Sequence, residues 1–189
     1  SYKKALELAF KKIEQNSIIS SWKDSYVSSK LQGFLHEFIN VPEYGCFKDF
    51  KKRKVKDREI VLDRIWAIGG NTGWYYGTFL WKIRGFLDQF FGGAGLRRGR
   101  RHPTELNVGD ALDFWRVIFA DKEQGKLLLY AEMVMPGEAW LEFKIKDGIL
   151  HQTATFRPHG LAGRMYWYSV MPFHWFVFNG MINNINKLK

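Results

Sequence analysis

The chain contains a single cysteine, Cys46, among its 189 residues. One cysteine cannot form a disulfide within the chain or build a cysteine-based zinc site. We therefore expect a protein of a reducing compartment, the cytoplasm, and interpret Cys46 as a small, half-buried apolar residue. A chain of this length buries enough surface on folding to need no disulfide or metal.

The motifs of familiar catalytic and cofactor sites are also missing. The five histidines are scattered without metal-ligand spacing, and no Ser-His-Asp arrangement is present. The stretch Gly92–Gly99 has one residue too many for a dinucleotide-binding loop, and it follows an expected helix instead of a strand. We expect no metal, no cofactor and no catalytic residue in this chain on its own.

Aromatic and basic residues are abundant. The 16 Phe, 8 Tyr and 8 Trp make up 17% of the chain and indicate an aromatic-lined interior, groove or interface. The net charge of +10 permits nucleic acid, an anionic membrane or an anionic ligand without selecting one. Because the aromatics lie inside expected helices and strands and do not alternate with basic residues, we expect no nucleic-acid binding.

The first third of the chain is predicted to be a separate segment. Apolar residues at helical spacing predict a helix over residues 1–15, and a short strand is expected at 18–22. Seven basic residues between Lys48 and Arg58 indicate a solvated connector. The boundary is placed there, with residues 1–55 as an N-terminal segment and 56–189 as the main domain.

The main domain is predicted as a strand, a helix, four strands in quick succession and a long helix. Their expected ranges are 59–68, 71–91, about 111–119, 126–135, 138–146, 149–157 and 161–186. The short links Pro136-Gly137 and Asp147-Gly148 predict hairpins, which make the sheet antiparallel. Between residues 139 and 146, apolar and mostly charged side chains alternate, which predicts one buried face and one wet face.

This order predicts an α+β helix-grip fold, in which a curved antiparallel sheet wraps around a long C-terminal helix. The long helix is the only element large enough to cover the sheet, and sheet twist leaves space between the two. Pro172 should kink that helix. Its last part is too rich in asparagine for a membrane-spanning helix, so we expect no membrane span.

Two groups of residues are candidate binding residues. The expected lining of an apolar cavity is Trp66, Trp74, Tyr76, Trp115, Phe143, Trp167, Met171 and Trp175, with polar orientation from Arg116, Glu132 or His174. His174 lies on an apolar stripe, where a buried, hydrogen-bonded histidine is the alternative interpretation. The loop residues Arg97, Arg98, Arg100 and Arg101 are candidates for binding an anion, a phosphate or carboxylate. A solvated loop or a contact with a neighbouring domain are the alternatives.

Several stretches of the main domain carry a recognisable run of motifs: Gly92–Pro103, Gly109–Val117, Met135–Phe143, Gln152–Phe156, Pro158, Gly160-Leu161, Tyr166-Trp167 and Pro172–His174. Together they resemble an uncharacterised bacterial domain family of the START/Bet v 1-like (SRPBCC) helix-grip superfamily. The resemblance covers about residues 56 to 189 and implies the helix-grip fold, but no reaction and no catalytic set.

The resemblance also implies a partner. Domains of this family commonly follow an NAD(P)-binding, epimerase-like short-chain dehydrogenase domain in the same polypeptide. Residues 1 to about 40 resemble the tail of such a domain, and the chain begins with Ser1 instead of Met. We therefore expect a piece of a longer protein, whose NAD(P) site would lie in the preceding domain.

Three functions follow as hypotheses. The first is the binding of an apolar or aromatic small molecule between the sheet and the C-terminal helix. The second is a substrate-presenting domain of an NAD(P)-dependent oxidoreductase or epimerase. The third is a structural module that docks onto a partner domain or forms a homodimer through its aromatic helix.

Overall fold

The computed structural model describes residues 40–93, 95 and 99–187. The helix and strand predicted within residues 1–39 lie outside the described residues, and so do Arg97 and Arg98. In chain order the described elements are β1 (Phe47–Lys54), α3 (Arg58–Trp66), α4 (Thr78–Phe90), β2 (Ala111–Leu112), β3 (Trp115–Asp121), β4 (Lys126–Ala131), β5 (Gly137–Lys146), β6 (Ile149–Pro158) and α5 (Gly160–Ile185).

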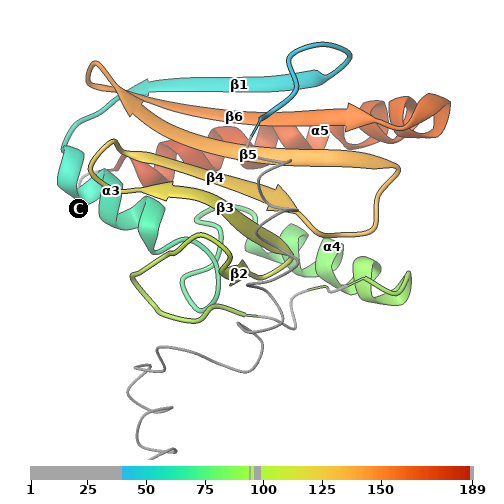
Figure 1. The fold of residues 1–189 in the computed structure, drawn as a ribbon, viewed down its shortest axis with the longest axis horizontal. Coiled ribbons are helices and arrows are strands. Elements are labelled where there is room, and N and C mark those ends of the chain that lie inside the picture. Colours follow the sequence, from blue (N-terminus) through green and yellow to red (C-terminus); the bar gives the residue numbers. More distant parts are fainter. Residues whose placement is uncertain (1–39, 94, 96–98, 188–189) are drawn as a thin grey trace, which may run out of the picture. The chain divides into compact units, whose positions relative to one another are not determined.

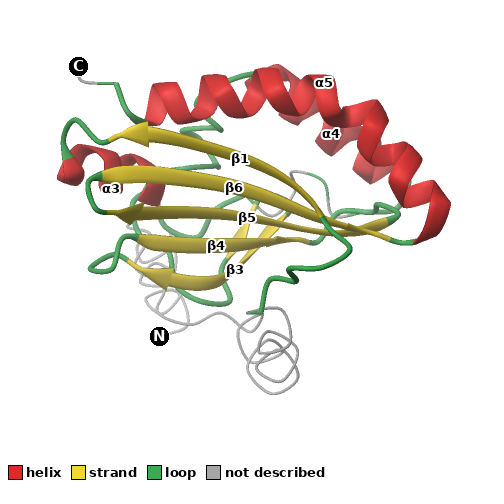
Figure 2. Ribbon diagram, turned by 90° about the horizontal axis from the view of Figure 1, so that it is seen from above, coloured by secondary structure: helices red, strands yellow, loops and turns green. Residues whose placement is uncertain are grey.

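The strands of the described residues form one antiparallel sheet in the order β1-β6-β5-β4-β3-β2. The sheet is curved, and both α4 and α5 lie on one side of it (Figure 1, Figure 2). The long helix α5 follows the sheet and bends along its length (Figure 2), with Pro172 inside it. The α+β helix-grip fold expected from the sequence is therefore confirmed.

The turn between β5 and β6 sets the register of the longest hairpin. Asp147 and Gly148 both have positive φ, 52° and 70°, which is the backbone of a type I′ turn. Lys146 accordingly pairs with Ile149, and the pairing continues to Gly137 opposite Pro158. The alternation predicted for β5 follows from this register, because Leu141, Phe143 and Ile145 all reach the core.

Strand β1 corrects the solvated connector predicted between Lys48 and Arg58. Residues 47–54 pair with β6 over their whole length, so the sheet begins well before residue 56. The sequence signal was hidden because β1 is an edge strand, where lysine and arginine are favoured on otherwise regular strands. Its Asp49 is nevertheless buried, and Arg53 donates to Asn183 of α5 at 2.7 Å.

Helix α3 corrects the strand predicted over residues 59–68. Asp57 caps the helix, accepting a hydrogen bond from the Ile60 amide at 3.0 Å, and Glu59 follows in the first turn. The isoleucine, valine and tryptophan content suggested a strand, but Val61, Leu62 and Ile65 are buried on one helical face. Capping and the spacing of buried residues outweighed the β-branched composition.

Helix α4 begins later than predicted, at Thr78 instead of directly after a cap at Asn71 or Thr72. The intervening segment contains four glycines with positive φ: Gly69, Gly70, Gly73 and Gly77. A left-handed backbone interrupts a right-handed helix, so this segment forms turns instead.

The second half of α5 is packed onto the sheet. Phe178, Met181, Ile182 and Ile185 are buried and share one core with β4, β5, β6 and α3. At Gly180 the ring of Tyr76 occupies the space that a Cβ would need, so the helix can pass this close only with glycine. Among the described helices, none combines the length and apolarity that crossing a bilayer requires.

Replacement of Arg64 by leucine should destabilise the fold by about 2 kcal/mol. The Arg64 guanidinium donates to the carbonyls of Asn184 at 3.0 Å and Ile185 at 3.2 Å, which end α5 without a helical partner. Urea unfolding measures the effect. Lys122→Met is the matched control, because the pair between Lys122 and Asp63 is largely exposed and should contribute under ~1 kcal/mol. Equal losses in both variants would contradict the assignment.

Candidate functional site

An apolar cavity of about 310 Å³ lies between the sheet and helices α4 and α5. Its α4 wall includes Leu80, Trp81, Ile83 and Leu87. Its α5 wall includes Trp167, Val170, Phe173, His174, Val177 and Phe178. Strands β3, β5 and β6 supply Trp115, Ala139, Ala154 and Phe156, and the segment after β4 supplies Met133 and Met135.

Small side chains on the sheet create this space. Ala139 and Ala154 line the cavity on the buried face of β5 and β6, where Ala154 pairs with Leu141. Farther along the same strands, Phe143 and Leu150 are fully buried in the packed core. The interior is therefore filled at one end of the sheet and hollow toward the other, under the middle of α5, whose lining residues extend from Tyr166 to Phe178.

The cavity opens to the surface between the two helices. Ile83 and Leu87 of α4 and Phe173 of α5 all line it, yet each is exposed to solvent. Side chains that are both lining and exposed lie at the mouth. A molecule can therefore enter through this gap without passing between strands.

Three buried polar atoms belong to the walls. The indole nitrogens of Trp81 and Trp115 and Nδ1 of His174 have no hydrogen-bond partner among the described residues. Burial lowers the pKa of His174 to about 4, with Asp49 opposing and Lys51 adding to the shift. The imidazole is therefore neutral at pH 7. An unpaired buried donor or acceptor costs about 1–3 kcal/mol, so the walls are poorer in hydrogen bonds than a packed core.

Of the eleven residues predicted to bind a ligand, Trp115, Trp167 and His174 line this cavity. Three others, Trp66, Trp74 and Phe143, are instead buried in the packed core. They were expected at the cavity because they are large and apolar, but each packs into the core instead, Trp74 against Trp81 and Trp115. The Trp74 indole donates to Asp113 at 2.9 Å, which ties its position to the start of β3.

The remaining predicted residues also lie away from the lining. Met171 and Trp175 are exposed on α5, because the helix turns a neighbouring face toward the sheet. Tyr76 packs against Phe176, with ring centroids 5.0 Å apart. Arg116 and Glu132 form a bidentate ion pair with both N–O distances at 3.0 Å, so each fixes the other.

Sequence reasoning missed Trp81, Ala139 and Ala154. Trp81 lies on α4 next to Leu80, at a position that the sequence analysis did not assign to the cavity. Ala139 and Ala154 could have been noticed in the sequence, because they are small residues among the otherwise large residues on the buried faces of their strands. Which helix lies opposite the buried faces of β5 and β6 depends on the tertiary fold, and the spacing of residues along the sequence does not reveal it.

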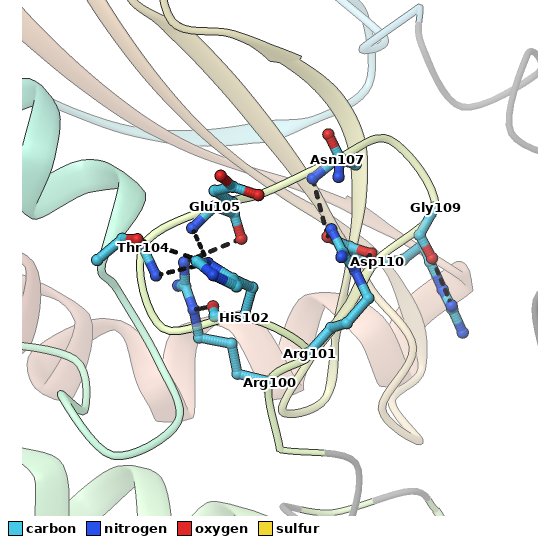
Figure 3. A network of polar contacts seen from close by, with 9 residues as sticks. Arg100, Arg101, His102, Thr104, Glu105, Asn107, Gly109 and Asp110 are labelled. Carbon is cyan, nitrogen blue, oxygen red and sulfur yellow. Dashed lines mark hydrogen bonds and ion pairs between the residues drawn. The ribbon is translucent and has the colours of Figure 1, made fainter. Parts of the chain in front are cut away.

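The described part of the arginine loop is held by contacts within the loop (Figure 3) and by contacts with the end of α3 and the residues after it. Arg100 donates to the backbone carbonyls of Ile68 at 2.5 Å and Glu105 at 3.2 Å, and also to those of Trp66 and His102. Burial lowers its pKa to about 10.

Arg101 is bonded in the same loop. It binds Asp110 through two contacts of 2.8 and 3.1 Å (Figure 3). The two described arginines therefore act as loop braces. Anion binding by Arg97, Arg98, Arg100 and Arg101 stays a prediction. In the described ranges no group of three or more His, Cys, Asp or Glu residues could hold a metal ion.

His174 should make the fold sensitive to mild acid. The pKa of His174 in the folded chain is about 4, below the usual 6.5. Between these two values the unfolded chain binds a proton and the folded chain does not. The stability that the neutral imidazole provides is therefore complete above pH 6.5 and is lost as the pH falls to 4. Lowering the pH from 7 to 4 should decrease the unfolding free energy of the unsubstituted protein by up to roughly 3 kcal/mol more than it decreases that of His174→Phe. Urea unfolding at each pH measures this.

The control is His159→Gln, at an exposed position just before α5. It should follow the unsubstituted protein at every pH. Imidazole NMR signals would report the pKa directly, and a value for His174 near 6.5 would refute the buried, neutral state.

Comparisons with known proteins place the chain in a family without a known activity. Residues 45–181 match the family described as "Protein of unknown function (DUF2867)". The match begins two residues before β1, in agreement with the inclusion of that strand in the domain. Comparison with curated proteins gave no match.

Two solved structures are similar in fold at low sequence identity. Ginseng major latex-like protein 151 from Panax ginseng is 9% identical with a TM-score of 0.41, covering 76% of this chain and 99% of its own. Norcoclaurine synthase from Thalictrum flavum, solved with dopamine and hydroxybenzaldehyde, is 10% identical with a TM-score of 0.40, covering 76% and 88%. Similarity at this level is too low to transfer a ligand or an activity. The family match, in contrast, spans most of the described domain, and the chain belongs to the DUF2867 family.

Proposed function

We propose that this domain binds an apolar or aromatic small molecule in the cavity under α5. The observation that carries the proposal is the cavity itself, about 310 Å³ of space walled by large apolar side chains. Protein interiors normally pack with few voids larger than a water molecule. A cavity of this size is at the lower end of the range for ligand pockets, which is ~300–1,000 Å³.

The size of the cavity favours a ligand with about two rings or an equivalent aliphatic chain. An apolar cavity of ~150 Å³ in another protein accommodates benzene, and this one is about twice as large. Burying such a molecule would contribute roughly 25 cal/mol for each Å² of apolar surface. Part of that is offset by the lost freedom of the ligand, so we expect affinities in roughly the micromolar range.

The charges near the walls favour a neutral ligand. Arg84 is the charged residue of the lining, and it donates to the Val134 carbonyl at 3.0 Å while lying 3.7 Å from the Asp88 carboxylate. His174 is neutral for the reason given above. A charged ligand would therefore lose its hydration without gaining a counter-charge.

The two other functions inferred from the sequence stay hypotheses. A substrate-presenting role beside an NAD(P)-binding domain of the same polypeptide would use the same cavity, with a substrate in place of a stored ligand. Assays of the longer polypeptide with NADPH and carbonyl compounds would separate that role from simple binding. Docking or dimerisation concerns the outer surface of the helices, not the cavity.

Replacing Ala154 with phenylalanine should weaken binding at least about ten-fold, because the new ring would occupy the hollow part of the sheet surface. The measurement is a fluorescence titration with N-phenyl-1-naphthylamine, a neutral aromatic probe. Ala162→Phe adds the same ring at an exposed position of α5 and should leave the affinity unchanged. An unsubstituted protein that fails to bind the probe, or equal binding by both variants, would overturn the proposal.

A further inference from the structure

Helices α4 and α5 expose large apolar side chains on both sides of the cavity mouth. On α4, Phe86 and Phe90 are 68% and 77% exposed, and Phe79 continues the same row at helical spacing. On α5, Phe173 at the mouth is 58% exposed, and Phe176, three residues farther along the helix, is 48% exposed. Both helices lie on one side of the sheet (Figure 2), and we call their outer surface the α4–α5 face.

Such a surface needs a partner to cover it. Monomeric proteins rarely expose contiguous apolar patches of this kind, and those that do commonly use them to bind another protein or a membrane. The inward sides of both helices are already used, since Leu80, Trp81 and Phe178 line the cavity.

The charge on this face has one sign. Lys82 and Arg164 are exposed on α4 and α5. The sole carboxylate of the two helices is Asp88, which is buried and accepts from the amides of Gly95 at 2.7 Å and Val134 at 2.6 Å. The α4–α5 face therefore presents aromatic rings and cations to solvent, with no exposed carboxylate on either helix.

This charge pattern distinguishes between two possible partners of the α4–α5 face, a second copy of the chain and an anionic bilayer. In a symmetric dimer the same patch faces itself, so Lys82 and Arg164 of one copy would meet a surface whose helices offer no exposed carboxylate to pair with them. A negatively charged partner has no such conflict. Aromatic and basic side chains side by side suit the surface of an anionic bilayer, where rings settle at the headgroup level and cations meet phosphates.

We propose that the α4–α5 face docks onto the surface of an anionic lipid bilayer. The exposed rings of both helices insert at the headgroup boundary, while Lys82 and Arg164 contact lipid phosphates. Docking in this orientation would turn the mouth between Ile83 and Phe173 toward the acyl chains. The net charge of +10 adds attraction at longer range. The contact is peripheral, and it does not require the cavity to hold a ligand.

Vesicle flotation of the full chain tests the proposal. The protein should float with vesicles of phosphatidylcholine containing about 30% phosphatidylglycerol, and much less with phosphatidylcholine alone. Phe86→Ser combined with Phe90→Ser should reduce partitioning at least about ten-fold through lost apolar burial. Lys82→Glu should reduce it about five-fold or more, an effect that vanishes at high salt.

The matched control is Tyr44→Ser combined with Phe50→Ser, which removes two exposed rings outside the α4–α5 face and should leave flotation unchanged. Thermal unfolding verifies that each variant is folded, and the comparison of the two lipid compositions needs no variant. Probe binding to the cavity should be equal in the Phe86/Phe90 variant and the unsubstituted protein, so failure here is distinguishable from failure of ligand binding.

Three results would overturn the proposal. One is an unsubstituted protein that does not float with anionic vesicles. Another is equal loss in the control and the Phe86/Phe90 variant. The last is a dimer in analytical ultracentrifugation that the Phe86/Phe90 substitutions dissociate, which would assign the α4–α5 face to a second copy of the chain.

Discussion

The contact between the second half of α5 and the sheet determines the rest of the domain. Phe178, Met181 and Ile182 fill the space above the strands, and Gln152 donates to the Phe178 carbonyl at 3.3 Å. The first half of α5 is supported differently, because Trp167 stacks on both Phe47 and Phe156, with centroids 5.3 and 5.7 Å away. The cavity lies between these two contacts, under the middle of α5.

The aromatic residues serve three separate purposes that composition alone merges. Trp74, Trp81, Phe114 and Trp115 form an aromatic cluster that joins α4 to the start of β3, and two of them, Trp81 and Trp115, also line the cavity. Other rings face solvent on α4 and α5. The same chemical character therefore contributes packing, cavity walls and exposed apolar surface within one small domain.

The sequence predicted the features that depend on local pattern. The Asp147-Gly148 turn, the alternation along β5 and the length of α5 are all set by neighbouring residues, and they are confirmed. The connector predicted in place of β1 was wrong because the basic residues of β1 lie on a strand at the sheet edge. The strand predicted in place of α3 was wrong because capping by Asp57 favours a helix there. Among the cavity residues, Trp115, Trp167 and His174 could be predicted from their apolar settings. The role of Ala154 could not, because a small side chain makes space only in relation to what lies opposite.

The basic run on β1 has a consequence for how copies of this protein behave at high concentration. Within the described residues β1 forms one border of the sheet, so its outer backbone groups have no neighbouring strand. An edge strand of eight residues can pair with a strand of another chain. Lys48, Lys52 and Lys54 place like charges along it, so two such borders repel each other. Chemical neutralisation of these lysines would remove that protection and favour fibrous aggregation of otherwise folded molecules.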